Sequence, residues 1–367
     1  MQNVLLTKLH QQGVISSETI TELEQLLKGS VQVQIVLNQQ GLNLAIGAKE
    51  VAFGKDELAT LAKTTFGSTD FDINDLDEPA DIREVAKQVL KSTATVQDSL
   101  ISVQKLAAQK IVLGTTAVAL TNLDGNTALT NLCAIHRAVV CTGSQPSAIC
   151  FSSKGVDVAS LTTMLVAFAK IASFVQFAEV NTDCTATQSV KSDNFIACVG
   201  QLTDAELTQD LKSKGDLIFL LGESKDDVTG SLYLNNCLQT EIAHGSVDIT
   251  KEESVTFILS DLNQKGLINA AKSVSRGGVY RALVDMSISN DLGFDIEADG
   301  EVRMDSFLFG EYNGRAIVTV SEDNEDEFIE YISTIELPST LLGHVTKGKL
   351  MIDGEHYGFI TDARALI

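Results

Sequence analysis

The spacing of apolar residues alternates along the chain between a helical period and a period of two. Residues 17–27 carry apolar side chains at helical spacing, after a serine that can cap a helix and before Gly29. Residues 31–37 alternate with a period of two, turn at residues 39–41 and alternate again over residues 42–46, which predicts a β-hairpin. Helical and strand-like segments in alternation favour a layered α/β or α+β fold over a helical bundle.

Further apolar runs predict the elements of the remaining chain. Strands are expected at residues 111–120, 147–151, 194–200, 217–222 and 315–320, and helices at residues 127–140, 156–174 and 279–286. Since 367 residues exceed the usual size of one hydrophobic core, we expect two domains, with a boundary near the polar residues 202–212. We divide the chain into residues 1–110, an unplaced extension or helix-and-hairpin segment, residues 111–205 and residues 206–367.

The net charge, the apolar stretches and the spacing of the cysteines limit which partners, locations and metal sites we expect. The formal net charge of −22 repels nucleic-acid phosphates, so we expect no nucleic-acid partner. The longest apolar stretch, residues 161–177, is interrupted by Lys170 and is too short to span a bilayer, so we expect no membrane segment. The first residues lack the features of a secretory signal, which favours a cytoplasmic protein. The six cysteines form no C-x-x-C pair, a spacing that predicts buried apolar residues rather than a zinc site.

Six segments resemble, in order, motifs of formylglycinamidine ribonucleotide synthase and its relatives. They are residues 142–149 (TGSQPSAI), 194–200 (NFIACVG), 215–234 (with GDLIFLLGE and GSLYL), 266–279 (GLINAAKSVSRGGV), 308–315 (LFGEYNGR) and 342–346 (LGHVT). The chain therefore resembles the aminoimidazole ribonucleotide synthetase-like superfamily over roughly residues 111–367. It resembles most the C-terminal half of phosphoribosylformylglycinamidine synthase. The resemblance implies an α+β fold of two domains, an N-terminal α/β dimerisation domain and a C-terminal α+β sandwich.

The departures from the family fall where its members carry carboxylates. Thr115 and Thr116 stand where the family's G-D-D-A-x-V strand end has two aspartates. Lys272, Ser273 and Arg276 replace the histidine and both aspartates of its H-D-V-S-D-G-G loop. Because Mg²⁺ is held by several oxygen ligands and hydroxyls are poor substitutes, these losses argue against a Mg²⁺ site. We therefore assign no catalytic and no metal-binding residue.

The loop at Ser275, Arg276, Gly277 and Gly278, directly before a helical pattern, is the main candidate for ligand binding. Glycines let backbone N–H groups approach a ligand, a helix N-terminus favours an anion, and Arg276 adds a cation. In the family this loop contributes to phosphate or substrate binding, so the resemblance implies a cofactor site for ATP or ADP. A tight strand-to-helix turn that needs glycine for its geometry is the alternative. The resemblance adds Gly114, Thr115 and Thr116 to the cofactor-binding residues.

Three other polar positions have a functional and a structural interpretation. Asn122 and Asp124 lie on an expected turn and could replace a lost metal ligand, but turn chemistry alone explains them. His136, on the helix at residues 127–140, could act in acid–base chemistry if a carboxylate lay in reach; a packed histidine is the simpler interpretation. Residues 179–183 carry oxygen ligands at alternating positions and indicate a polar or metal site.

Three functions remain open at this level. The resemblance combined with the lost carboxylates favours a degenerate, non-catalytic relative that binds a nucleotide and is auxiliary to purine biosynthesis. The first alternative is an active ATP-dependent ligase that forms an amidine, and the second is an acidic interaction scaffold. The resemblance also implies a homodimer and a partner protein of purine biosynthesis.

Overall fold

The computed structural model describes residues 31–67, 71–95, 101–106, 110–120, 123–177, 193–240 and 242–367. The helix expected at residues 17–27, the polar run at residues 179–183 and Asn122 lie outside the described residues. The chain forms two compact units. Unit 1 comprises Met1–Gly67, Asp98–Val139 and Gln145–Gln201, and unit 2 comprises Ser68–Gln97, Val140–Ser144 and Leu202–Ile367.

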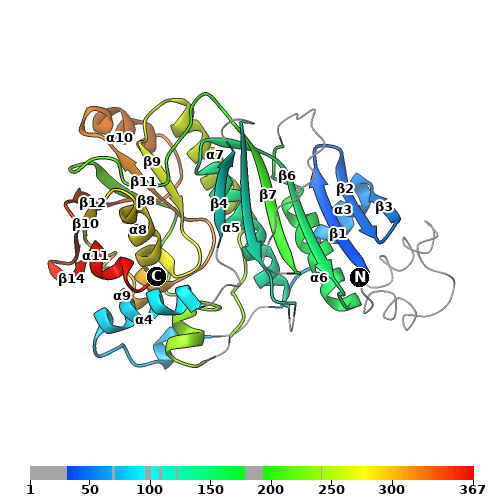
Figure 1. The fold of residues 1–367 in the computed structure, drawn as a ribbon, viewed down its shortest axis with the longest axis horizontal. Helices are drawn as coiled ribbons and strands as arrows, with labels where there is room; N and C mark the ends of the chain where they lie inside the picture. Colours follow the sequence, from blue (N-terminus) through cyan, green and yellow to red (C-terminus); the bar gives the residue numbers. More distant parts are fainter. Residues whose placement is uncertain are drawn as a thin grey trace. The chain divides into compact units, whose positions relative to one another are not determined.

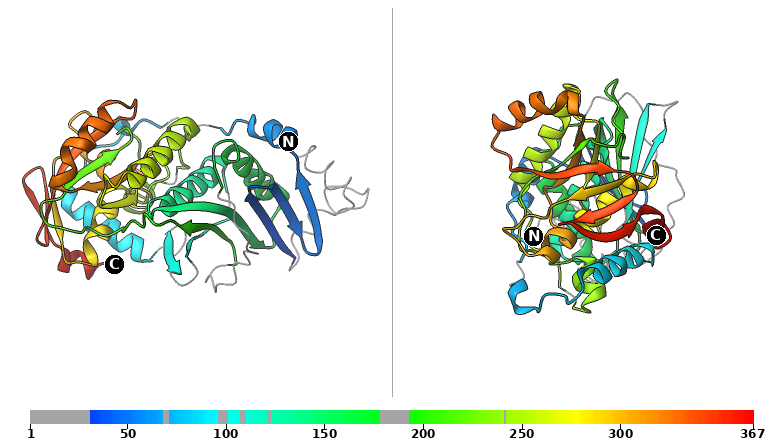
Figure 2. Two further views of the ribbon diagram at one scale, coloured as in Figure 1. Left: turned by 90° about the horizontal axis from the view of Figure 1, so that it is seen from above. Right: turned by 90° about the vertical axis from the view of Figure 1, so that its left-hand side faces the viewer.

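Unit 1 is built on one sheet, which has seven strands among the described residues in the order β3-β2-β1-β6-β7-β5-β4. Its strands are β1 (Gln32–Asn38), β2 (Gly41–Ile46), β3 (Lys49–Phe53), β4 (Ser102–Leu106), β5 (Ile111–Ala117), β6 (Ser144–Lys154) and β7 (Phe195–Leu202), and its helices are α3 (Lys55–Ala62), α5 (Gly125–Val140) and α6 (Val158–Ile171). Strands β1 and β2 pair antiparallel, which confirms the predicted hairpin. Figures 1 and 2 show α5 and α6 on one face of this sheet.

Both faces of the sheet of unit 1 are apolar at β5. On β5, a side chain at Gly114 would point at Ile135 and Val139 of α5. The preceding residue, Leu113, faces the opposite side of the sheet, because side chains on a strand alternate between the two faces. Leu113 accordingly belongs to a separate apolar cluster with Ala197 and residues beside it on β7. The strand predicted at residues 111–120 and the helix predicted at residues 127–140 are thus confirmed as β5 and α5.

Unit 2 is built on a second sheet, with strand order β14-β13-β10-β12-β8-β11-β9 in the described part of the chain. Its strands are β8 (Leu217–Leu221), β9 (Ala270–Ser273), β10 (Gly293–Ile296), β11 (Ala316–Val320), β12 (Ser339–Thr346), β13 (Lys349–Ile352) and β14 (Glu355–Phe359). Its helices are α4 (Ile82–Thr95), α7 (Ile249–Gln264), α8 (Gly278–Ile288), α9 (Met304–Phe309), α10 (Glu325–Ser333) and α11 (Ile360–Arg364), with short turns of helix η1 (Ile73–Asp75), η3 (Tyr233–Cys237) and η4 (Glu322–Asn324).

Strand β8 shows why this half of the sequence has continuous apolar runs. Ile218 and Leu220 belong to one apolar cluster, which includes residues of α4, α8, α9 and α11. Phe219 and Leu221 belong to a second cluster, formed with α7 and α10. A strand buried on both faces needs no polar alternation. The sheet therefore lies between two layers of helices, and the expected α+β sandwich is confirmed.

Residues 1–110 contribute to both units. Strand β1 pairs with β6 and so joins the sheet of unit 1, whereas α4 packs in the core of unit 2. Arg303 ties the segment before α4 to unit 2, because its Nη1 donates to the carbonyl oxygens of Ile73 (2.7 Å) and Leu76 (2.9 Å). The division into residues 1–110, 111–205 and 206–367 stays a prediction.

Candidate functional site

The turn from β9 to α8 has a geometry that only glycine adopts without strain. Gly277 has a φ of +84° and Gly278 a φ of +70°, both in the left-handed region. A Cβ atom on Gly278 would lie 2.4 Å from the carbonyl oxygen of Leu308 and 2.8 Å from backbone atoms of Phe309. The N–H of Gly278 closes the turn on the carbonyl of Ser275 at 2.9 Å. Turn geometry alone is therefore a sufficient reason for both glycines.

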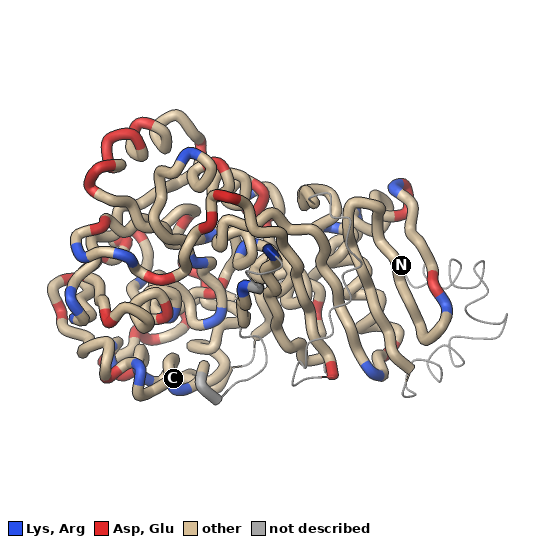
Figure 3. Tube along the Cα trace, turned by 45° about the horizontal axis from the view of Figure 1, so that its top comes forward, with Lys and Arg blue, Asp and Glu red and all other residues tan. Residues whose placement is uncertain are grey.

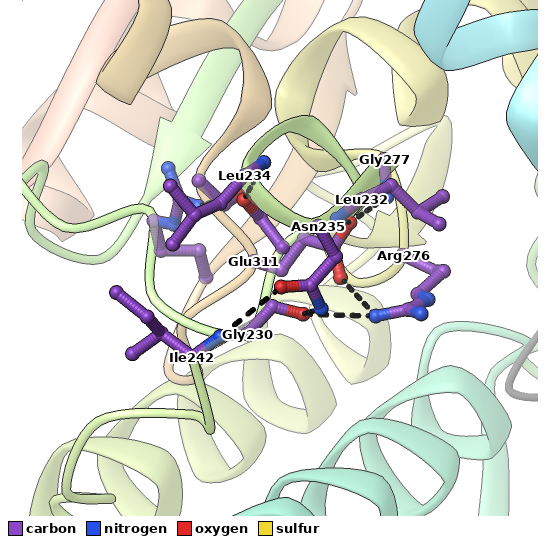
Figure 4. Close-up of polar contacts among 11 residues, drawn as sticks. Gly230, Leu232, Leu234, Asn235, Ile242, Arg276, Gly277 and Glu311 are labelled. Atoms are coloured by element: carbon purple, nitrogen blue, oxygen red, sulfur yellow. Dashed lines mark hydrogen bonds and ion pairs between the residues drawn. The ribbon is translucent and has the colours of Figure 1, made fainter. Parts of the chain in front are cut away.

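The N–H group of Gly277 faces a carboxylate of the protein itself. It donates to Oε1 of Glu311 at 2.7 Å, and the N–H of Leu232 donates to the same oxygen at 2.8 Å (Figure 4). The Glu311 side chain is only 2% exposed. A buried carboxylate is stable only when its oxygens are bonded and its charge is balanced. The protein thus supplies its own anion at the position where the sequence indicated an external one.

Arg276 balances the charge of this buried carboxylate. Its Nη1 lies 3.0 Å from Oε2 of Glu311 and donates to the carbonyl oxygen of Gly230, also at 3.0 Å (Figure 4). The Arg276 side chain is 18% exposed. At a position where the family loop has an aspartate, this chain therefore places a cation next to a carboxylate. We call Gly230, Leu232, Arg276, Gly277 and Glu311 the Glu311 cluster.

Three of the motifs quoted from the sequence meet at the Glu311 cluster. Gly230 and Leu232 belong to the GSLYL segment, Arg276 and Gly277 to the SRGG loop, and Glu311 to the LFGEYNGR segment. We did not single out Glu311 from the sequence. Its signal is a lone carboxylate directly after an apolar run and Gly310, but nothing in that pattern indicates its partners.

Gly114, Thr115 and Thr116 lie on β5 in unit 1. Gly114 faces α5, where the Cγ1 atom of Ile135 and the Cγ2 atom of Val139 would lie 3.3 Å and 3.0 Å from an added Cβ. Thr116 shares that face and is buried, whereas Thr115 is half-buried. The role of these residues, and of Ser275–Gly278, in cofactor binding stays a prediction.

Asp124 and His136, two of the other polar candidates, have structural roles. Asp124 directly precedes α5, where its Oδ1 accepts from the N–H of Thr127 at 2.9 Å and its carboxylate also accepts from the Thr127 hydroxyl. His136 is buried, and its ring meets that of Phe174 edge-on at 5.8 Å between centroids. Burial, assisted by the charge of Arg137, lowers the pKa of His136 to about 3. Among the described residues, no group of three or more His, Cys, Asp or Glu side chains could hold a metal ion.

In the variant His136→Leu, the free energy of unfolding should fall less steeply as the pH is lowered than in the wild type. Between its folded pKa of about 3 and the ordinary value of 6.5, only the unfolded chain takes up the proton. The stability linked to His136 is thus complete above pH 6.5 and falls by up to ~1.4 kcal/mol per pH unit toward pH 3. Urea unfolding at pH 7, 6 and 5 measures this slope. His356→Leu, at an exposed position, is the control for the removal of one histidine. Equal slopes in wild type and His136→Leu would contradict the assignment.

Comparison with known proteins identifies relatives of the C-terminal part of the chain. The family described as "AIR synthase related protein, C-terminal domain" matches residues 213–353. The phosphoribosylformylglycinamidine synthase subunit PurL of Caldanaerobacter subterraneus subsp. tengcongensis is 33% identical over 147 residues, 40% of this chain and 20% of that protein. The PurL subunit of Carboxydothermus hydrogenoformans is 30% identical over 165 residues, 44% of this chain and 23% of that protein. The matched region thus spans less than a quarter of the length of these curated relatives.

Solved structures extend the similarity in fold beyond the matched sequence. Thermotoga maritima PurL complexed with ADP has a TM-score of 0.54 at 13% identity and covers 80% of this chain and 53% of that one. The PurLQS structure from the same organism has a TM-score of 0.51 at 14% identity, with coverages of 76% and 50%. Within the described residues, no helix combines the length and apolar character needed to cross a membrane. The chain therefore has the two-domain α+β fold of the aminoimidazole ribonucleotide synthetase-like superfamily, and its C-terminal region is similar in sequence to the AIR synthase related proteins, PurL among them.

Proposed function

We propose that this chain is a degenerate, non-catalytic PurL-like protein that binds ATP or ADP without Mg²⁺. The observation that carries the proposal is the ion pair between Arg276 and Glu311. A carboxylate of this kind could serve a bound cation, but here a guanidinium group lies 3.0 Å from it. A second cation at the same carboxylate would face repulsion from Arg276. The pair thus supports loss of metal-assisted chemistry with retention of the fold.

Similarity to PurL supports the nucleotide in this proposal. Thermotoga maritima PurL has been solved with ADP, and its fold covers most of this chain. The ligand would need help from backbone N–H groups and a few cationic side chains, because the chain as a whole carries a net charge of −22. We also propose a homodimer and a protein partner in purine biosynthesis. The solved PurLQS structure from Thermotoga maritima supports the second of these, the protein partner.

Calorimetric titration with ADP, with and without Mg²⁺, tests the proposal. We expect one dissociation constant under both conditions, since the carboxylate of Glu311 is already paired with Arg276. Binding that is at least tenfold tighter with Mg²⁺ would contradict it, and ATP hydrolysis that depends on formylglycinamide ribonucleotide would support the active ligase instead.

The acidic scaffold remains the second candidate. Acidic residues concentrate at η4 and the start of α10 (Figure 3), where Glu325, Asp326 and Glu327 form the first turn of the helix. Negative side chains at a helix N-terminus stabilise the helix through its dipole. The cluster thus has a structural reason of its own, and no binding of ADP at all would be the result that favours the scaffold.

A further inference from the structure

A pocket of about 120 Å³ lies in unit 2 and shares no residue with the Glu311 cluster. Four segments line it: the loop after β8, the first turns of α7, the loop before β11 and the residues before β12. Cavities near this size hold ligands of about six heavy atoms. The pocket is therefore large enough for a small metabolite and too small for a nucleotide.

Two charged side chains of the lining, Lys225 and Glu336, form no ion pair among the described residues, although the charge of Lys225 also helps to lower the pKa of Glu223. Lys225 extends from the loop after β8, and its Nζ lies 5.6 Å from the centroid of the Tyr312 ring. The guanidinium carbon of Arg315 lies 3.7 Å from the same centroid, so two cations share one ring. The Tyr312 hydroxyl accepts from the N–H of Lys225 at 2.7 Å and so holds this loop in place. Glu336, exposed just before β12, supplies the opposite charge.

Three other charged or amide side chains of the lining differ in whether they already have partners. Lys251 and Glu223 pair with each other, and Asp248 already caps the N–H groups of Thr250 and Lys251, so the start of α7 offers no free anion site. Asn313 is different, because neither the oxygen nor the nitrogen of its amide has a hydrogen-bond partner in the described structure. Its amide loses no hydrogen bond when it turns toward the pocket.

We propose that this pocket binds a small zwitterionic α-amino acid. The ligand carboxylate would pair with Lys225 and its ammonium group with Glu336, while the amide of Asn313 can donate to the first and accept from the second. Leu337 and Pro338 offer apolar surface to a short side chain. A ligand with only one charged end would pair with Lys225 or with Glu336 and leave the other side chain without a ligand group of opposite charge. This proposal does not depend on the proposed function.

Calorimetry of the full chain with L-alanine tests the proposal, with acetate and methylammonium as half-ligands that carry one charge each. We expect L-alanine to bind at least tenfold more tightly than either half-ligand. Both Lys225→Met and Glu336→Gln should weaken it about tenfold. The matched control is Lys265→Met, because Lys265 also lies 5.6 Å from a tyrosine ring, that of Tyr331, but outside the pocket.

Other outcomes would overturn the assignment. If acetate or inorganic phosphate binds as tightly as L-alanine and Glu336→Gln changes nothing, the site is a simple anion site. Absence of L-alanine binding in the wild type, or an equal loss in Lys265→Met, would also reject the zwitterion site. Nucleotide binding measured on the same samples reports on the Glu311 cluster, so failure of either proposal is recognised separately.

Discussion

Replacing Glu311 by alanine is expected to destabilise unit 2 by about 3–5 kcal/mol, because it leaves a largely buried guanidinium group without its counter-charge. Arg276 is only 18% exposed, so water cannot replace the carboxylate fully. The N–H groups of Gly277 and Leu232 lose their acceptor at the same time. Urea unfolding followed by circular dichroism gives the free energy of unfolding. We expect unit 2 to unfold at a lower urea concentration in the variant than in the wild type.

Three further variants make this measurement specific. Glu311→Gln keeps an oxygen for the two N–H groups and should cost less than Glu311→Ala. Arg276→Met in the Glu311→Ala background removes the stranded charge and should recover part of the loss. Glu223→Ala removes a carboxylate whose partner Lys251 is 47% exposed, and surface pairs of this kind contribute about 1 kcal/mol or less. If Glu311→Ala costs no more than Glu223→Ala, the Glu311 cluster does not hold this region together.

Most of the sheet architecture could be predicted from the sequence, because it depends on local periodicity. The apolar run at β8 reflects burial on both faces of the strand, and the alternation in β1 and β2 reflects burial on one face. Both patterns can be read from the order of apolar and polar residues. The course of the chain between the units could not be predicted. Helix α4 belongs to unit 2, although along the chain it comes between strands β3 and β4 of unit 1. Its position depends on core residues far away in the sequence, such as Tyr280 and Phe309.

The same distinction applies to the candidate site. The glycines at 277 and 278 indicated a close backbone approach and an anion at the start of α8, and an anion lies there. Its source could not be inferred, because Glu311 is 34 residues from Gly277 and 79 from Leu232 along the chain. Only tertiary packing brings such positions together. An arginine in place of the family's aspartate was visible in the sequence, but its partner was not.

Gly278→Ala is expected to destabilise the protein by about 3–5 kcal/mol, as measured by urea unfolding. Part of this loss, ~1–2 kcal/mol, comes from placing an alanine at a φ of +70°. The rest comes from contact, since the new Cβ would lie 2.4 Å from the carbonyl oxygen of Leu308, a backbone atom that cannot move aside as a side chain can.

Gly266→Ala separates the two contributions. Gly266 has nearly the same φ, +71°, but an added Cβ there meets no atom within 4 Å. It should therefore lose only the ~1–2 kcal/mol of backbone strain. The difference between the two variants measures how tightly α8 is packed against the end of α9, and it should exceed 1 kcal/mol. Equal losses would mean that α8 shifts to make room, and in that case Gly277 and its hydrogen bond to Glu311 would have to shift as well.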